Sequence, residues 1–140
     1  MAKIEFKGVN EYAQQLDELG ADAEGICRYA IYDAAGLVMD AIIDNAPVDT
    51  GDLRESVELS VMKNKDGFIY TQVIFEWYDR KGTPNSLKAR AIESGTSRMQ
   101  KRPFIRPAVN RVKKQAEQLI AENLDKKLNE IMNEIYEIKH

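Results

Sequence analysis

The chain has little of what catalytic and metal-binding centres are built from. Its 140 residues include one cysteine, Cys27, and one histidine, His140. A single cysteine excludes an intrachain disulfide and a cysteine-based zinc cluster within one chain. With no histidine nearby in the sequence, Cys27 is interpreted as a small buried hydrophobe rather than a nucleophile. We therefore expect no catalytic residue, no cofactor and no metal, and synthesis in a reducing cytoplasm.

Long apolar runs are absent as well. No stretch reaches the ~20 apolar residues that cross a bilayer, and residues 1–8 lack the apolar run of a secretory leader. Hydrophobic residues make up 44% of the chain and charged residues 31%, which are ordinary values for a folded domain. The composition predicts a single domain over residues 1–140 with no membrane partner.

The net charge of -3 argues against a surface built throughout for nucleic acid. One segment differs, because seven basic residues and no acidic residue lie between Ser97 and Ala116. They are Arg98, Lys101, Arg102, Arg106, Arg111, Lys113 and Lys114. We expect this strip to face either a phosphate backbone or an acidic patch on a protein neighbour.

Helical periodicity marks both ends of the chain. Apolar residues at helical spacing predict a short helix over 9–19 that stops at Gly20. A second helix is predicted over about 22–45 and is stopped by Pro47. Over 107–138 the apolar residues again step by three and four, which predicts a helix of about 30 residues and roughly 45 Å. Such a rod is longer than a small domain is wide, so its far end is expected to pack on another chain or to break into two helices.

The middle of the chain, residues 56–108, is predicted to be sheet and loops. Apolar and polar residues alternate over 57–62 and over 69–77, and turn formers at 64–67 separate these runs. One side of the first run holds Val57, Leu59 and Val61, and one side of the second holds Ile69, Thr71, Val73, Phe75 and Trp77. This pattern predicts an antiparallel hairpin with one face in the core.

The stretch before the last helix is less regular. Residues 78–86 are polar and contain Gly82 and Pro84, which predicts a loop or an insertion. Residues 89–93 fit a helix or a strand, and we interpret them as a helical turn leading into a strand-like segment. The fold class is therefore α+β, with N-terminal helices over 9–46 packed on a small antiparallel sheet and a long C-terminal helix.

Three short strings are rich in Pro, Gly, Asp and Thr, which fix backbone shape. They are residues 46–56 (APVDTGDLRES), 92–99 (IESGTSRM) and 102–108 (RPFIRPA). Their turn positions are Pro47, Asp49, Thr50, Gly51, Leu53, Glu93, Gly95, Thr96, Pro103 and Pro107. We expect rigid corners of a scaffold, with the Asp49 side chain accepting hydrogen bonds from backbone N–H groups.

The order of these strings resembles a bacteriophage head-tail joining family, the one named for gene product ten of a lambdoid phage. The first string is similar to the family's most recognisable stretch. The second resembles its Glu-x-Gly-Thr-Ser segment and the third its Pro-Phe-x-x-Pro-Ala segment. The helical N-terminus and the long last helix agree with the family's outline, whereas residues 78–90 look longer than the link that the family has there.

The resemblance implies a structural virion component and no enzyme, made in the cytoplasm of a bacterial host. It implies a homo-oligomeric ring at the head-tail junction of a long-tailed phage or prophage, acting as a neck or tail-completion protein. A head-completion or connector protein would lie on one side of the ring, and a tail terminator or tail-tube protein on the other. The residues expected to face a neighbouring subunit, or DNA in the channel, are Arg98, Arg102, Phe104, Arg106 and Arg111.

Two other classes of protein stay open. A DNA-binding accessory protein would use the strip Arg98–Lys114, with Phe104 as a stacking platform for bases. An aspartic protease would use Asp49-Thr50-Gly51, the tripeptide in which paired aspartates activate water. Here the tripeptide follows a predicted helix and a proline rather than an apolar strand, which favours a turn.

Overall fold

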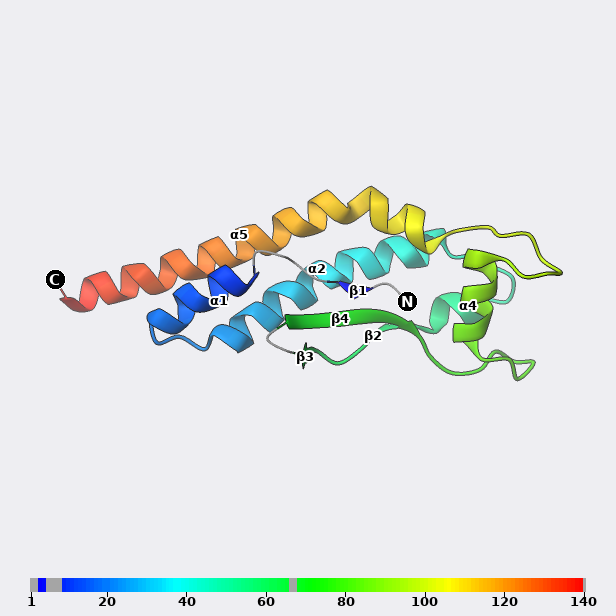
Figure 1. Cartoon of the computed structure of the whole chain (residues 1–140), viewed down its shortest axis with the longest axis horizontal. Coiled ribbons are helices and arrows are strands. Elements are labelled where there is room, and N and C mark those ends of the chain that lie inside the picture. Colours follow the sequence, from blue (N-terminus) through cyan, green and yellow to red (C-terminus); the bar gives the residue numbers. More distant parts are fainter. Residues whose placement is uncertain (1–2, 5–8, 66–67, 140) are drawn as a thin grey trace.

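The computed structural model describes residues 3–4, 9–65 and 68–139, and it confirms an α+β fold. In chain order the elements are β1 (Lys3–Ile4), α1 (Val9–Glu18), α2 (Ala23–Asn45), α3 (Asp52–Glu55), β2 (Val57–Leu59), β3 (Lys63–Lys65), β4 (Phe68–Phe75), α4 (Asn85–Ser94) and α5 (Ile105–Lys139). Figure 1 shows an elongated molecule in which α2 and α5 run antiparallel along the long axis. Helices α3 and α4 lie at one end, and α1 and the end of α5 lie towards the other.

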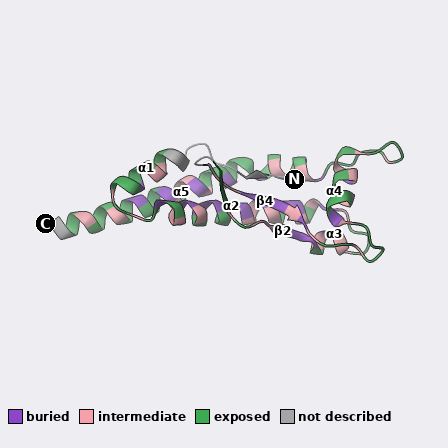
Figure 2. Ribbon diagram, turned by 60° about the horizontal axis from the view of Figure 1, so that its bottom comes forward, coloured by how far each residue is buried: buried purple, intermediate pink, exposed green. Residues whose placement is uncertain are grey.

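Helix α2 is the central element. It packs against α5 on one side and against β2 and β4 on another, and α1 also contacts it. Its buried positions are mostly small, with alanine at 30, 34, 35 and 41. Figure 2 shows the buried residues gathered along the inner faces of α2, α5 and β4. This layer between helix and sheet is the hydrophobic core.

The ends of α2 agree with the sequence-based bounds. The Asp22 carboxylate accepts a hydrogen bond from the Gly25 backbone N–H at 3.1 Å and so caps the first turn. At the other end Ala46 is extended, as the residue before Pro47 should be.

Helix α5 is one unbroken helix of 35 residues, about 52 Å long at 1.5 Å per residue. The predicted alternative of a break into two helices is therefore wrong. Its buried stripe steps by four residues from Ala108 to Leu128, while Met132 and Tyr136 beyond it are more than half exposed. Packing of this far end on another chain stays a prediction. None of the described helices combines the length and the apolar character that a bilayer crossing requires.

Strand β4 is the middle of the sheet, with β1 on one edge and β2 and β3 on the other, all antiparallel. Leu59 pairs with Val73, whereas Lys63 pairs with Tyr70. The chain advances four residues from Leu59 to Lys63, whereas β4 advances only three from Tyr70 to Val73. A one-residue bulge therefore separates β2 from β3.

The bulge changes which side chains face the core, because a shift of one residue moves a strand's side chains to the opposite face. Val61, predicted to share a face with Val57 and Leu59, is 77% exposed. Met62 packs against the core instead. The predicted hairpin is confirmed, although Asp66 and Gly67 of its predicted turn lie outside the described residues.

Three other expectations for the middle of the chain are wrong. Trp77, predicted on the same side as Phe75, is 76% exposed because β4 has already ended. A short helix, α3, precedes β2 where a direct turn into a strand was expected. Residues 85–94 form a regular helix, and the segment after it is irregular rather than strand-like.

Cys27 is fully buried in α2, as predicted. Burial, with a smaller contribution from the Asp17 charge, raises the pKa of its thiol to about 11. Because the thiolate is the nucleophile, we expect no alkylation of the native protein by iodoacetamide at about pH 8 and full alkylation in denaturant. Mass spectrometry after timed labelling measures this. Rapid stoichiometric labelling of the native chain would contradict it.

Candidate functional site

The first string is far in the sequence from the second and third, which nearly adjoin, but all three meet at the α3–α4 end of the molecule. A hollow of about 250 Å³ lies among them. Residues 47 and 49–53 of the first string line it, together with Ile92 and Met99 of the second and Arg102 of the third. A larger hollow of about 620 Å³ lies between α2 and α5 and contains no residue of the three strings. The α3–α4 end is therefore the candidate site.

The first string turns the chain from α2 into α3. The Thr50 hydroxyl accepts a hydrogen bond from the Asp52 N–H at 3.3 Å. Gly51 has a φ of 90°, a left-handed conformation that favours glycine, and Leu53 is buried. Thr50 thus makes the hydrogen bond that was expected of Asp49. The Asp49 carboxylate is exposed and makes no hydrogen bond or ion pair with another described residue.

Arg54 ties this turn back to α2. Its guanidinium donates hydrogen bonds to the carbonyl oxygens of Ala46 at 3.1 Å and Asp44 at 3.2 Å. The last carbonyls of a helix have no partner within the helix, so these bonds satisfy two acceptors that would otherwise need water.

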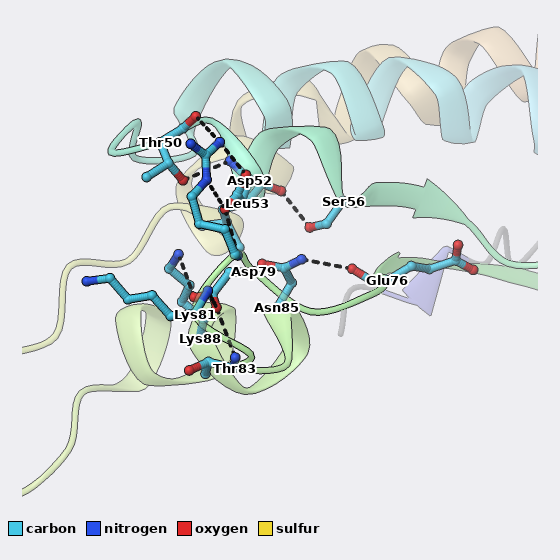
Figure 3. Close-up of polar contacts among 11 residues, drawn as sticks. Thr50, Asp52, Leu53, Ser56, Glu76, Asp79, Lys81, Thr83, Asn85 and Lys88 are labelled. Carbon is cyan, nitrogen blue, oxygen red and sulfur yellow. Dashed lines mark hydrogen bonds and ion pairs between the residues drawn. The ribbon is translucent and has the colours of Figure 1, made fainter.

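Asp52 connects the first string to the segment after β4. Its carboxylate accepts hydrogen bonds from Arg80 Nε at 3.0 Å, Arg80 Nη2 at 2.9 Å and the Arg80 backbone N–H at 3.1 Å (Figure 3). These bonds hold the pKa of Asp52 well below its ordinary value, and they raise the pKa of Arg80. The segment 78–84 is thereby fixed against α3.

Acid is expected to weaken this connection. A depressed carboxyl pKa in the folded state gives stability that is complete above the unfolded value of about 3.9 and is lost as the pH falls towards the folded value. The melting temperature of Asp52→Asn should therefore fall less than that of the wild type between about pH 5 and pH 2.5. Circular dichroism melts measure this, with the exposed carboxyl of Asp40 replaced in Asp40→Asn as the control. Equal falls in Asp52→Asn and wild type would refute the assignment.

Segment 78–84 is a closed loop rather than an open insertion. Asp79 accepts hydrogen bonds from the backbone N–H groups of Lys81 and Thr83, both at 2.9 Å, and an ion pair at 3.3 Å joins it to Lys88 (Figure 3). The bond from Thr83 is the main cause that lowers the pKa of Asp79. Lys88 lies on α4, so the loop is also fixed to that helix.

Glu93 links the second string to the third. Its carboxylate, at the end of α4, accepts hydrogen bonds from the backbone N–H groups of Phe104, Ile105 and Arg106 at 2.9 to 3.1 Å. Those N–H groups begin α5 and have no acceptor within the helix. A carboxylate there is also stabilised by the positive end of the helix dipole. The side chain of Glu93 thus joins helix α4 to helix α5.

The loop between α4 and α5 has a fixed shape. Gly95 has a φ of 78°, and a Cβ there would lie 2.9 Å from the Lys101 backbone N. The Thr96 N–H donates to the Met99 carbonyl at 2.8 Å, and the Thr96 hydroxyl accepts from the Arg98 N–H at 3.2 Å. Glycine is therefore required at position 95 for both conformation and space.

The third string anchors α5 in the core. Phe104 is 3% exposed and its ring meets the Phe75 ring edge-on, with centroids 5.9 Å apart. The proposed role of Phe104 as a stacking platform for bases is therefore wrong, because no face of the ring is available. Pro103 is exposed ahead of α5, and Pro107 lies in its first turn, where a missing N–H costs little.

The four predicted interface arginines, Arg98, Arg102, Arg106 and Arg111, are all exposed. Arg111 donates to the Asn45 side chain at 3.4 Å. Within the described residues none of the four forms an ion pair. Contact of these arginines with a neighbouring subunit or with DNA stays a prediction.

Sequence reasoning missed the residues that join the strings to the rest of the frame: Arg54, Arg80, Lys88 and Asn85. Each acts through a partner distant in the sequence, so no local pattern marked it. Within the described residues no group of three or more His, Cys, Asp or Glu could hold a metal ion. The arrangement fixes the backbone and presents exposed side chains, which suits binding.

Comparison with known proteins assigns the chain to a class. A family model described as "Bacteriophage HK97-gp10, putative tail-component" matches residues 10–95, more than half of the chain. The chain belongs to this family, and it is accordingly a phage tail component, a part of the virion. The match spans α1 to α4 and contains the first string and Glu93, while α5 lies beyond it. Neither the curated proteins nor the solved structures contain a match.

Proposed function

We propose that the chain is a structural component of the head-tail connection, a neck or tail-completion protein. It would assemble as a homo-oligomeric ring between the portal or connector and the tail tube of a long-tailed phage or prophage. Membership of a family of tail components supports the coarser part of this proposal. A head-completion or connector protein on one face of the ring and a tail terminator or tail-tube protein on the other are its partners.

The observation that carries the proposal is the rigid, exposed α3–α4 end. Its corners are fixed by hydrogen bonds to Thr50, Asp79 and Glu93. Around these corners lie exposed apolar and aromatic side chains, namely Val48, Trp77, Tyr78 and Leu87. Tryptophan, tyrosine and arginine dominate the energetics of protein interfaces, and a preformed backbone lowers the entropy lost on binding. These features support repeated contact with other subunits.

Deletion of the gene from its phage or prophage tests the proposal. We expect electron microscopy to show DNA-filled heads and separate tails, with attachment restored when the wild-type chain is supplied from a plasmid. Normal tailed particles would overturn the proposal. If the tails are attached but have an altered length, the chain controls tail length and does not act at the head-tail junction.

The ring itself is tested by the mass of the purified chain in solution. Native mass spectrometry and sedimentation velocity should show a homo-oligomer whose population rises with protein concentration. A strict monomer at high concentration that is also absent from purified virions would refute assembly at the junction.

A further inference from the structure

A third hollow, of about 210 Å³, is lined on one side by Asp52, Glu55 and Ser56 of the first string. Its lining includes Glu55, Trp77, Tyr78 and Asn85. Trp77 and Tyr78 are 76% and 68% exposed, so both rings offer surface to an incoming group. Trp77 has a φ of 64°, which is strained for a non-glycine residue, and its carbonyl accepts from the Asn85 N–H at 2.9 Å. The fold therefore holds this tryptophan outward at a conformational cost.

Asn85 supplies an unused acceptor to this hollow. The residue is 2% exposed, and its Nδ2 donates to the Glu76 carbonyl at 3.0 Å (Figure 3). Its Oδ1 is buried and has no hydrogen-bond partner within the described residues. Buried polar atoms in native proteins nearly always have a partner, so this acceptor is left for a donor that the described residues do not supply, a water or a group of another molecule.

The remaining polar groups of the hollow also suit a donor with positive charge. The Glu55 carboxylate forms no hydrogen bond or ion pair within the described residues, whereas Asp52 beside it is already paired with Arg80. Aromatic faces next to a free carboxylate and a free amide oxygen favour a guanidinium group, which stacks on aromatic rings and donates several hydrogen bonds. We call the surface formed by Glu55, Trp77, Tyr78 and Asn85 the aromatic socket.

A guanidinium of suitable placement exists on the same chain. Arg98 lies in the middle of the loop between α4 and α5, is exposed and has no ion pair within the described residues. Its backbone N–H is bonded to Thr96, so the loop presents it from a fixed position. Figure 1 shows this loop and the segment after β4 at opposite ends of α4, and Figure 2 shows the same separation. Asn85 of the socket is the first residue of α4, whereas Arg98 follows its last residue, so socket and loop belong to different ends of this helix.

We propose that the aromatic socket receives Arg98 of a second copy of this chain. The inference rests on the proposed ring and names its subunit contact. A socket at one end of α4 and an arginine beyond the other end make a heterologous contact, which repeats from copy to copy and closes into a ring when the rotation allows. Charge complementarity favours a second copy as the partner. The socket offers the Glu55 carboxylate, and residues 97–116 carry positive charge without a single acid.

A charge exchange tests the contact. Glu55→Arg and Arg98→Glu should each raise the concentration for half-assembly at least about tenfold, and the double variant with both changes should recover most of the loss. Matched controls make the same charge changes at exposed sites outside the contact and outside the basic strip, namely Glu58→Arg on β2 and Lys63→Glu on β3. Sedimentation velocity measures assembly, and equal melting temperatures verify folding.

Trp77 offers a second readout because it is the only tryptophan of the chain. Its emission should change as the wild type assembles, and this change should be absent in Arg98→Glu but present in Lys63→Glu. If the wild type assembles and the socket variants behave like their controls, the socket is wrong and the ring stands. If the contact behaves as expected but deletion of the gene leaves head-tail attachment normal, the socket stands and the proposed function fails. A wild type that neither assembles nor changes its Trp77 emission overturns the socket.

Discussion

Replacing Phe104 by alanine should lower the free energy of unfolding by about 3–5 kcal/mol. The ring is 3% exposed and packs edge-on against Phe75, so truncation removes a large buried apolar surface and leaves a cavity. It also loosens the segment from which α5 begins. A domain of this size is stable by only about 5–15 kcal/mol, so the loss is a large part of the total.

Chemical denaturation followed by circular dichroism measures the effect of Phe104→Ala. Tyr29→Ala is the matched control, because Tyr29 is an aromatic residue that is 75% exposed, and its change should stay within about 0.5 kcal/mol. A loss below about 1 kcal/mol for Phe104→Ala would show that the ring is not part of the core.

Glu93→Ala should cost about 2–3 kcal/mol. The half-buried carboxylate accepts three backbone N–H bonds at the start of α5, and alanine leaves all three donors without a protein partner. Glu93→Gln keeps one acceptor oxygen and loses the charge, so an intermediate loss is expected. The cost should concentrate at the joint between α4 and α5 rather than spread over the core.

Two measurements test the role of Glu93. Denaturation gives the free energy, with the exposed Glu117→Ala on α5 as the control. Hydrogen exchange gives the location, because the amides of Phe104, Ile105 and Arg106 should exchange faster in Glu93→Ala while those in the middle of α2 keep their protection. Unchanged exchange at these three amides would contradict the cap.

Helices α1, α2 and α5 could be predicted from the sequence because their signals are local. Apolar periodicity lies within the segments that it defines, and the stops at Gly20 and Pro47 lie directly after them. The hairpin was also predictable, but its bulge was not, since a bulge depends on the pairing of two strands. Strand β1, two residues long, has no pattern that would reveal it and exists only through its pairing with β4.

The candidate site was predictable in its positions but not in its connections. Turn residues such as Gly51 and Gly95 follow from backbone chemistry, and both have positive φ. The cap that Glu93 forms on α5 could not be inferred. The backbone N–H groups that donate to its carboxylate lie 11 to 13 residues away, across an irregular loop. The exposure of Trp77 was equally hidden, since alternation alone does not say where a strand ends.

The clamp made by Glu93 has a mechanical consequence. It fixes the base of α5 to α4, and the buried stripe up to Leu128 fixes the shaft to α2, so the helix cannot pivot independently at its base. We therefore expect a displacement imposed on the loop to move α4, α5 and α2 together, over a helix about 52 Å long. The exposed turns beyond Leu128 would carry that movement to the far end of the molecule.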